Sequence, residues 1–155
     1  MPTFQTTRLV GHTPLEMFDL VADVEKYPQF LPLCLDMRVR RRQSGQDGEE
    51  IIVAEMQVGY RAIRERFTSR VNLDRAGLKI LVEYIDGPFR TLHNRWQFLA
   101  VGEDACRVEF FITYEFASRT LALLMGAMFD RAFRKFAEAF EQRADLVYGR
   151  RRRIS

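Results

Sequence analysis

The sequence predicts an α+β fold in which a curved antiparallel sheet of about seven strands wraps around a long C-terminal helix. Two observations lead to this prediction. Between residues 35 and 116, turn sequences rich in Gly and Asp recur at short intervals between β-rich runs, as in an antiparallel meander. After Ser118 the spacing of apolar residues changes from every second residue to the period of a helix. We therefore expect a single domain over residues 1–149, followed by a basic tail over residues 150–155.

The N-terminal segment is expected to form the first strand and then two short helices. Residues 3–10 alternate loosely between polar and apolar side chains, which indicates a strand. Thr13 stands where a helix N-cap is expected, and Glu16, three residues later, completes a capping box. Pro28 and Pro32 limit the next segment to a short helical turn, because proline lacks an amide donor and restricts the residue before it.

Three strands of the meander have a side that is expected to face the core. The clearest is the strand over residues 107–116, in which large apolar side chains alternate with charged and polar ones. The side chains expected to face inward are Ile63, Glu65, Phe67, Ser69, Val71 and Leu73; then Leu92, Asn94, Trp96 and Phe98; and finally Val108, Phe110, Ile112, Tyr114 and Phe116. Most of them are apolar, so the concave side of the sheet suits either a core or an apolar cavity.

The C-terminal helix, expected over residues 118–148, has two halves of different character. From residue 130 onwards it is amphipathic, which is typical of a helix packed on a sheet. Residues 121–129 are instead apolar on nearly every side, and such a helix has to be covered by protein, ligand or membrane. Gly126 lies within this half at a cost of about 1 kcal/mol relative to Ala, which suggests an adjustable point in a lid.

Three motifs occur in a fixed order along the chain. They are Val21-Ala22-Asp23-Val24-Glu25-Lys26-Tyr27-Pro28-Gln29-Phe30-Leu31-Pro32, then Asp86-Gly87-Pro88-Phe89 followed by Trp96 and Phe98, and last Tyr114-Glu115-Phe116. Together they resemble the coenzyme Q-binding branch of the START-like, polyketide-cyclase-related superfamily over nearly the whole chain. The resemblance implies a helix-grip fold that binds ubiquinone or a related lipid as a carrier in cellular respiration, without known catalysis. The bacterial ribosome association toxins called RatA are similar in the same motifs, so the resemblance also leaves ribosome binding open.

The candidate ligand-binding residues come from the inward faces of the strands and from the helix. They are Glu65, Phe67, Asn94, Trp96, Phe98, Phe110, Tyr114, Leu121, Leu124, Met125, Met128, Phe129, Phe133 and Phe136. Asn94 and Tyr114 are candidates to bind quinone carbonyls, or they satisfy backbone groups. Glu65 is either a ligand-binding or acid/base group or a member of a structural ion pair. An aromatase or cyclase that uses Glu65 and Tyr114 is the second alternative to a quinone carrier.

No catalytic centre or metal site is expected. Cys34, Cys106, His12 and His93 are isolated from one another, which does not match the spacing of a zinc or haem site. The sequence contains no glycine-rich phosphate loop and no nucleophile elbow. We therefore expect no required cofactor, with ubiquinone as a bound ligand only.

The basic residues suggest contacts with anionic partners other than DNA. The tail Arg150, Arg151, Arg152 and Arg153 and the cluster Arg38, Arg40, Arg41 and Arg42 could bind lipid headgroups or ribosomal RNA. The tail equally suits a solvated helix end. Because no secretion signal or bilayer-spanning stretch is recognisable, we expect a cytoplasmic protein that can contact the inner membrane peripherally.

Overall fold

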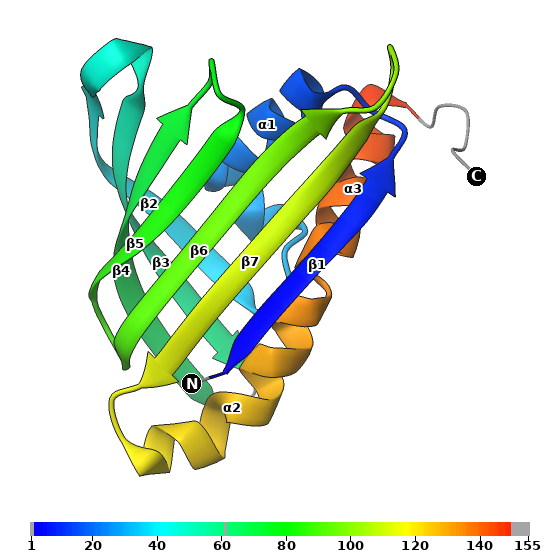
Figure 1. The fold of residues 1–155 in the computed structure, drawn as a ribbon. Coiled ribbons are helices and arrows are strands. Elements are labelled where there is room, and N and C mark those ends of the chain that lie inside the picture. The colour runs from blue at the N-terminus through cyan, green and yellow to red at the C-terminus, as the bar shows by residue number, and fades with distance from the viewer. Residues whose placement is uncertain (1, 61, 150–155) are drawn as a thin grey trace.

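The computed structural model describes residues 2–60 and 62–149, and these residues contain one seven-stranded antiparallel sheet. Its strands are β1 (Thr3–Val10), β2 (Cys34–Ser44), β3 (Glu50–Tyr60), β4 (Ile63–Asp74), β5 (Lys79–Asp86), β6 (Phe89–Ala100) and β7 (Cys106–Phe116). Strands β2 to β7 are neighbours in chain order, and β1 joins the sheet beside β7 (Figure 1). The predicted meander and the number of strands are confirmed. The predicted tail over residues 150–155 lies outside the described residues.

The helical segments lie before and after the meander, apart from one short turn between β2 and β3. They are α1 (Pro14–Ala22), the 3-10 helices η1 (Val24–Gln29) and η2 (Gln46–Gly48), α2 (Arg119–Arg134) and α3 (Phe136–Tyr148). The two short helices expected after the first strand are α1 and η1. The capping box is confirmed, because the Thr13 hydroxyl accepts from the Glu16 amide at 3.1 Å and the Thr13 amide donates to the Glu16 carboxylate at 3.0 Å.

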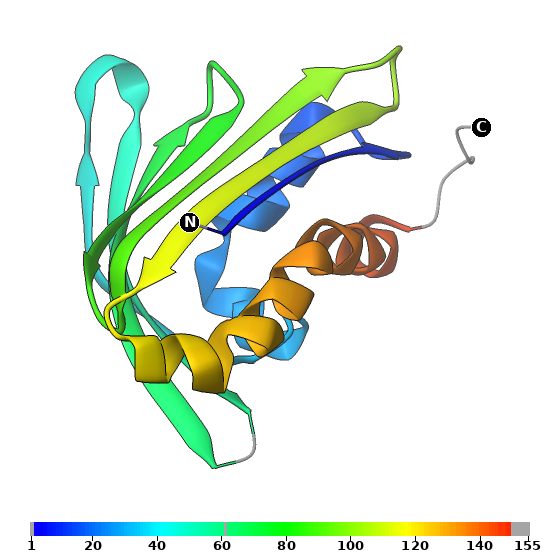
Figure 2. The same ribbon diagram turned by 60° about the horizontal axis from the view of Figure 1, so that its bottom comes forward.

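The C-terminal helix differs from the prediction in one respect, because it is divided at Lys135 into α2 and α3. Lys135 has φ −99° and ψ −3°, and its amide donates to the carbonyl of Ala132 at 3.0 Å, as in a 3-10 turn. Neither Gly nor Pro lies at this position, so tertiary packing rather than local sequence sets the break. The two helices consequently run at an angle to each other below the concave face of the sheet (Figure 2).

The concave face of the sheet carries the apolar core. All five inward side chains expected on β7 are buried, and the outward ones are half-buried or exposed. On β4 the alternation holds from Phe67 onwards, whereas Ile63 and Glu65, near the start of the strand, are only half-buried. Phe18 of α1 packs edge-on against Phe98 of β6, with ring centroids 6.1 Å apart. No helix in the described ranges is long and apolar enough to cross a membrane.

Helix α3 is attached to the N-terminal part of the chain by polar contacts as well as by packing. The pairs are Arg8 Nε with a Glu141 carboxylate oxygen at 2.5 Å, His12 Nε2 with an Asp145 carboxylate oxygen at 2.7 Å, and the Tyr148 hydroxyl donating to the Glu16 carbonyl at 3.1 Å. The His12 ring is fully buried. These contacts fix α3 over α1 and the end of β1, on one side of the concave face.

Candidate ligand-binding site

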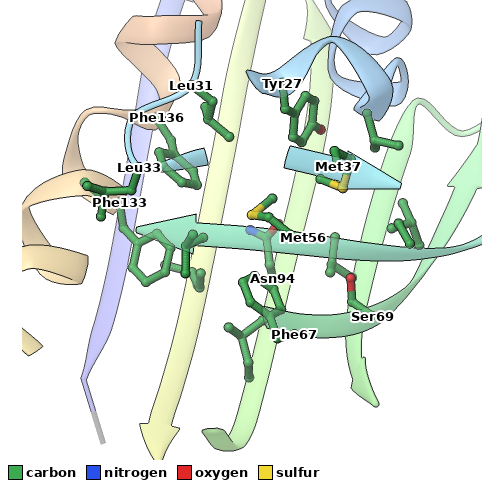
Figure 3. Close-up of a pocket in the computed structure, with 18 of the residues that line it drawn as sticks. Tyr27, Leu31, Leu33, Met37, Met56, Phe67, Ser69, Asn94, Phe133 and Phe136 are labelled. Carbon is green, nitrogen blue, oxygen red and sulfur yellow. The ribbon is translucent and has the colours of Figure 1, made fainter. Parts of the chain in front are cut away.

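An apolar cavity of about 80 Å³ lies between the concave face of the sheet and helices α2 and α3. Its walls come from η1 and the loop after it, from strands β2 to β7, and from both C-terminal helices (Figure 3). Apart from the indole N–H of Trp96, the polar groups of the wall belong to three side chains, namely Tyr27, Ser69 and Asn94. A cavity with such walls suits a hydrocarbon ligand that forms few hydrogen bonds.

Two of the three polar side chains already have protein partners. The Tyr27 hydroxyl donates to the Val21 carbonyl, and burial raises the pKa of this phenol well above its usual value. Asn94 donates to the Phe111 carbonyl at 2.8 Å and accepts from the Trp96 indole at 3.1 Å. The Ser69 hydroxyl has no hydrogen-bond partner among the described residues. Ser69 and the remaining capacity of the Asn94 amide are therefore the groups available to a polar atom of a ligand.

A second, open groove of about 450 Å³ adjoins the cavity between α2, the loop after η1 and the start of β4. Its walls are Pro32, Leu33, Ile63, Leu124, Ala127, Met128, Arg131, Ala132 and Lys135. Pro32, Leu33 and Ala132 line both the cavity and the groove, so these three residues form the boundary between them. The groove is the natural mouth of the cavity.

Leu33, at this boundary, has an unusual backbone conformation. Its φ of 67° lies in the left-handed region, which costs a residue with a side chain about 1–3 kcal/mol. The Leu33 carbonyl accepts from the Gly59 amide at 3.0 Å. A Cβ on Gly59 would lie 2.5 Å from Leu35 Cδ1, so glycine there allows β3 to approach this segment closely.

Helix α2 covers the cavity with one side and exposes apolar side chains on the other. Met125 and Phe129 are buried, whereas Leu123 is 87% exposed and Leu124 is 59% exposed. The apolar half of the helix noted in the sequence is therefore only partly covered by the chain's own described residues.

Residues 10–141 match the model of the family described as polyketide cyclase/dehydrase and lipid transport. The chain belongs to this family. Among curated relatives, the ribosome association toxin RatA of Escherichia coli K12 is 35% identical over 97% of this chain and 92% of that protein. The mitochondrial coenzyme Q-binding protein COQ10 homolog B of Xenopus laevis is 28% identical over 95% of this chain and 59% of that protein.

Two solved structures share the fold of this chain. The 18 kDa protein CC1736 of Caulobacter crescentus is 38% identical, with a TM-score of 0.76 over 96% of this chain and 99% of that one. A START superfamily protein of Mycobacterium smegmatis has a TM-score of 0.75 over 94% of this chain and 98% of that one, at 18% identity, and so shows the fold alone. The START-like, helix-grip architecture expected from the motifs is thus confirmed.

In this member of the polyketide cyclase and lipid transport family, twelve of the fourteen candidate residues are divided between three places. Those on the cavity wall are Phe67, Asn94, Trp96, Phe129, Phe133 and Phe136. Leu124 and Met128 line the groove instead. Phe98, Phe110, Tyr114 and Met125 are buried in the core away from the cavity. Leu121 packs partly buried against the core, and half-buried Glu65 lines neither the cavity nor the groove.

Neighbouring rings explain why the core candidates do not reach the cavity. Phe98 is covered by Phe18 of α1, and Tyr114 packs against Phe89, Phe116 and Phe133, with ring centroids 5.1 to 6.0 Å apart. These aromatic contacts leave no space beside the two side chains. The placement of the inward face was correct, but only part of that face borders the cavity.

Sequence reasoning missed the wall formed by residues 24–37 and by β3. In Figure 3, Tyr27, Leu31, Met37 and Met56 surround the cavity on this side. The first motif contains Tyr27 and Leu31, so the available signal was the resemblance rather than any periodicity. Thioether side chains are flexible, which makes this the adaptable wall of the cavity.

The two thiols of this family member are buried, and each is shielded from solvent in the described structure. Burial raises the pKa of both thiols, Cys34 and Cys106, to about 12, so they stay protonated and weakly nucleophilic at neutral pH. Within the described ranges, His, Cys, Asp and Glu side chains nowhere gather in a group of three that could hold a metal ion.

Proposed function

We propose that the protein binds a hydrophobic lipid in its cavity and carries it, and that ubiquinone is the ligand. The observation that supports this most strongly is the cavity itself, whose wall is mostly apolar and offers the polar side chains of Tyr27, Ser69 and Asn94. A quinone ring needs only one or two donors for its carbonyls, which the Ser69 hydroxyl and the Asn94 amide can supply. The motifs shared with coenzyme Q-binding proteins favour the same ligand.

The cavity has to enlarge when a lipid enters. Its volume of about 80 Å³ is small beside the roughly 300–1,000 Å³ of pockets that hold drug-sized ligands. Two features allow enlargement: the flexible side chains of Met37 and Met56, and the separate helix α2, which the break at Lys135 divides from α3. We propose that the structure corresponds to the closed, unloaded state.

Trp96 provides a direct test, because it is the only tryptophan and it lines the cavity. Titration with a short-chain ubiquinone is expected to quench Trp96 fluorescence with saturation. Organic extraction of protein purified from its native source, followed by mass spectrometry, is expected to yield the bound quinone. Absence of both saturable quenching and extracted lipid would overturn the proposal.

We propose that α2 contacts a membrane surface when lipid is loaded. Leu123 on α2 is 87% exposed, so Leu123→Asp is expected to reduce binding to anionic liposomes several-fold while changing the melting temperature little. Leu124→Asp should act in the same direction, although Leu124 also lines the groove. Leu146→Asp on α3 is the matched control at 75% exposure. Equal liposome binding of wild type and Leu123→Asp in a flotation assay would remove the membrane contact.

We propose binding without catalysis, since Glu65 and Tyr114, the candidate acid/base pair, lie off the cavity wall. Burial raises the pKa of Tyr114 to about 12, which makes the phenol a poor proton donor at neutral pH. Glu65→Gln is accordingly expected to bind the short-chain ubiquinone with an affinity within about twofold of wild type. A tenfold loss in the Trp96 titration would assign Glu65 to the ligand site after all.

Ribosome binding is the second candidate, and the 35% identity to RatA favours it. The Arg cluster noted in the sequence offers limited support, because Arg38, Arg40 and Arg42 each pair with a carboxylate. The candidate tail, Arg150 to Arg153, lies outside the described residues. Co-sedimentation with ribosomal subunits that falls steeply with salt would support this function, and none at low salt would exclude it.

A further inference from the structure

Two basic side chains lie at the mouth of the cavity. Arg131 and Lys135 line the groove, are both exposed, and lie four residues apart on one side of α2 and its C-cap. The other groove residues carry apolar side chains. Like charges at this spacing repel each other, so an anion between them would be stabilised.

Neither cation has an ion-pair partner among the described residues, which distinguishes them from their neighbour on the helix. Arg134 pairs with the Asp130 carboxylate at 3.0 Å and lies over the Phe4 ring, with its guanidinium carbon 4.9 Å from the ring centroid. The C-terminal end of α2, with its C-cap, therefore carries one neutralised cation away from the groove and two available cations within it.

The polarity of the cavity and of the groove determines which end of an amphiphile each would hold. The cavity offers few free hydrogen-bonding groups, so burying a charged head there would carry a large desolvation cost. A hydrocarbon tail has no such cost. Because Pro32, Leu33 and Ala132 line both spaces, a tail in the cavity can continue directly into a head in the groove (Figure 3 shows Leu33 beside Phe133 and Phe136).

We infer that the site also takes a long-chain carboxylate, a fatty acid bound tail first, with its head between Arg131 and Lys135. This inference rests on the proposed lipid-binding function. A guanidinium binds a carboxylate through two parallel hydrogen bonds. The cations also lie at the C-terminal end of α2, where the partial negative charge of the helix disfavours a phosphate dianion more than a carboxylate.

The experiment compares two ligands that share a tail and differ only in the head. A dibrominated stearic acid and its methyl ester both quench Trp96 when the tail enters the cavity, and both are titrated into the full chain below their aggregation concentrations. Wild type is expected to bind the acid at least tenfold more tightly than the ester. The double variant Arg131→Gln/Lys135→Gln should lose this preference and keep its affinity for the ester, whereas Arg134→Gln should retain the preference.

The possible results distinguish a failure of the carboxylate site from a failure of the proposed lipid-binding function. Equal affinity of wild type for acid and ester, or a preference that survives in the double variant, would overturn the carboxylate site. So would a lower melting temperature of the double variant with an unchanged preference, because the cations would then serve only the helix end. Tighter binding of a lysophosphatidic acid with the same tail would replace the carboxylate by a phosphate head. If neither brominated ligand nor ubiquinone quenches Trp96, the lipid-binding function itself fails.

Discussion

Phe140→Ala is expected to lower the free energy of unfolding by about 3–5 kcal/mol. Phe140 is 1% exposed and is one of two α3 residues, with Phe136, that line the cavity. Its ring meets those of Tyr27, Phe30 and Trp96 edge-on, with centroids 5.1 to 5.3 Å apart. Truncation would open a void among three aromatic rings that cannot collapse into it. Urea denaturation followed by circular dichroism measures the loss.

The matched control for this prediction is Leu146→Ala on the same helix. Leu146 is 75% exposed, so its truncation should change the free energy of unfolding by less than about 0.5 kcal/mol. A loss below about 1 kcal/mol for Phe140→Ala would mean that α3 does not pack closely on η1 and β6. The aromatic cluster would then not be what closes the cavity on this side.

Ala54→Leu is expected to reduce the affinity for a short-chain ubiquinone at least tenfold, or by about 1.4 kcal/mol. Ala54 is 2% exposed and lines the cavity from β3. A larger side chain there would occupy the space that the ligand needs, while its new apolar contacts offset part of the strain of insertion. Saturable quenching of Trp96 measures the effect.

Ala100→Leu adds the same atoms at an exposed position near the end of β6, and should leave the affinity unchanged. If Ala54→Leu binds the quinone as well as wild type does while remaining folded, the ligand does not enter this cavity. The groove beside α2 would then be the adjoining space in which to look for it.

Much of the fold could be predicted because its signals are local. Alternation on β6 and β7, the capping box at Thr13 and the N-cap Ser118, whose hydroxyl accepts from the Leu121 amide at 3.1 Å, each depend on residues close in sequence. The break at Lys135 has no such signal, because neither Gly nor Pro lies there. Periodicity alone extends a helix through a break of this kind.

The candidate site could be predicted only in part, for the same physical reason. Phe67 on β4 and the pair Asn94 and Trp96 on β6 come from strands on either side of β5, so inward alternation was enough to bring them to one face. Met37 and Leu33 come from irregular segments, whose side-chain directions follow from a bulge and a left-handed residue rather than from a period. Whether a cation at the mouth is available to a ligand depends on which carboxylates lie near it. This is known only from the three-dimensional arrangement.

The pairing of β1 with β7 has a consequence for how the chain acquires its structure. Thr3 pairs with Thr113, 110 residues later, so the first strand stays without its partner until most of the chain has been synthesised. Such distant pairings carry a large loop-closure cost and slow folding. During translation the strands β2 to β6 can pair one after another. The contacts of β1 and α1 and the covering of the concave face form only once the last third of the chain has been made. The space that would hold a lipid is therefore completed only when β1 has paired with β7 and helices α2 and α3 have packed on the sheet.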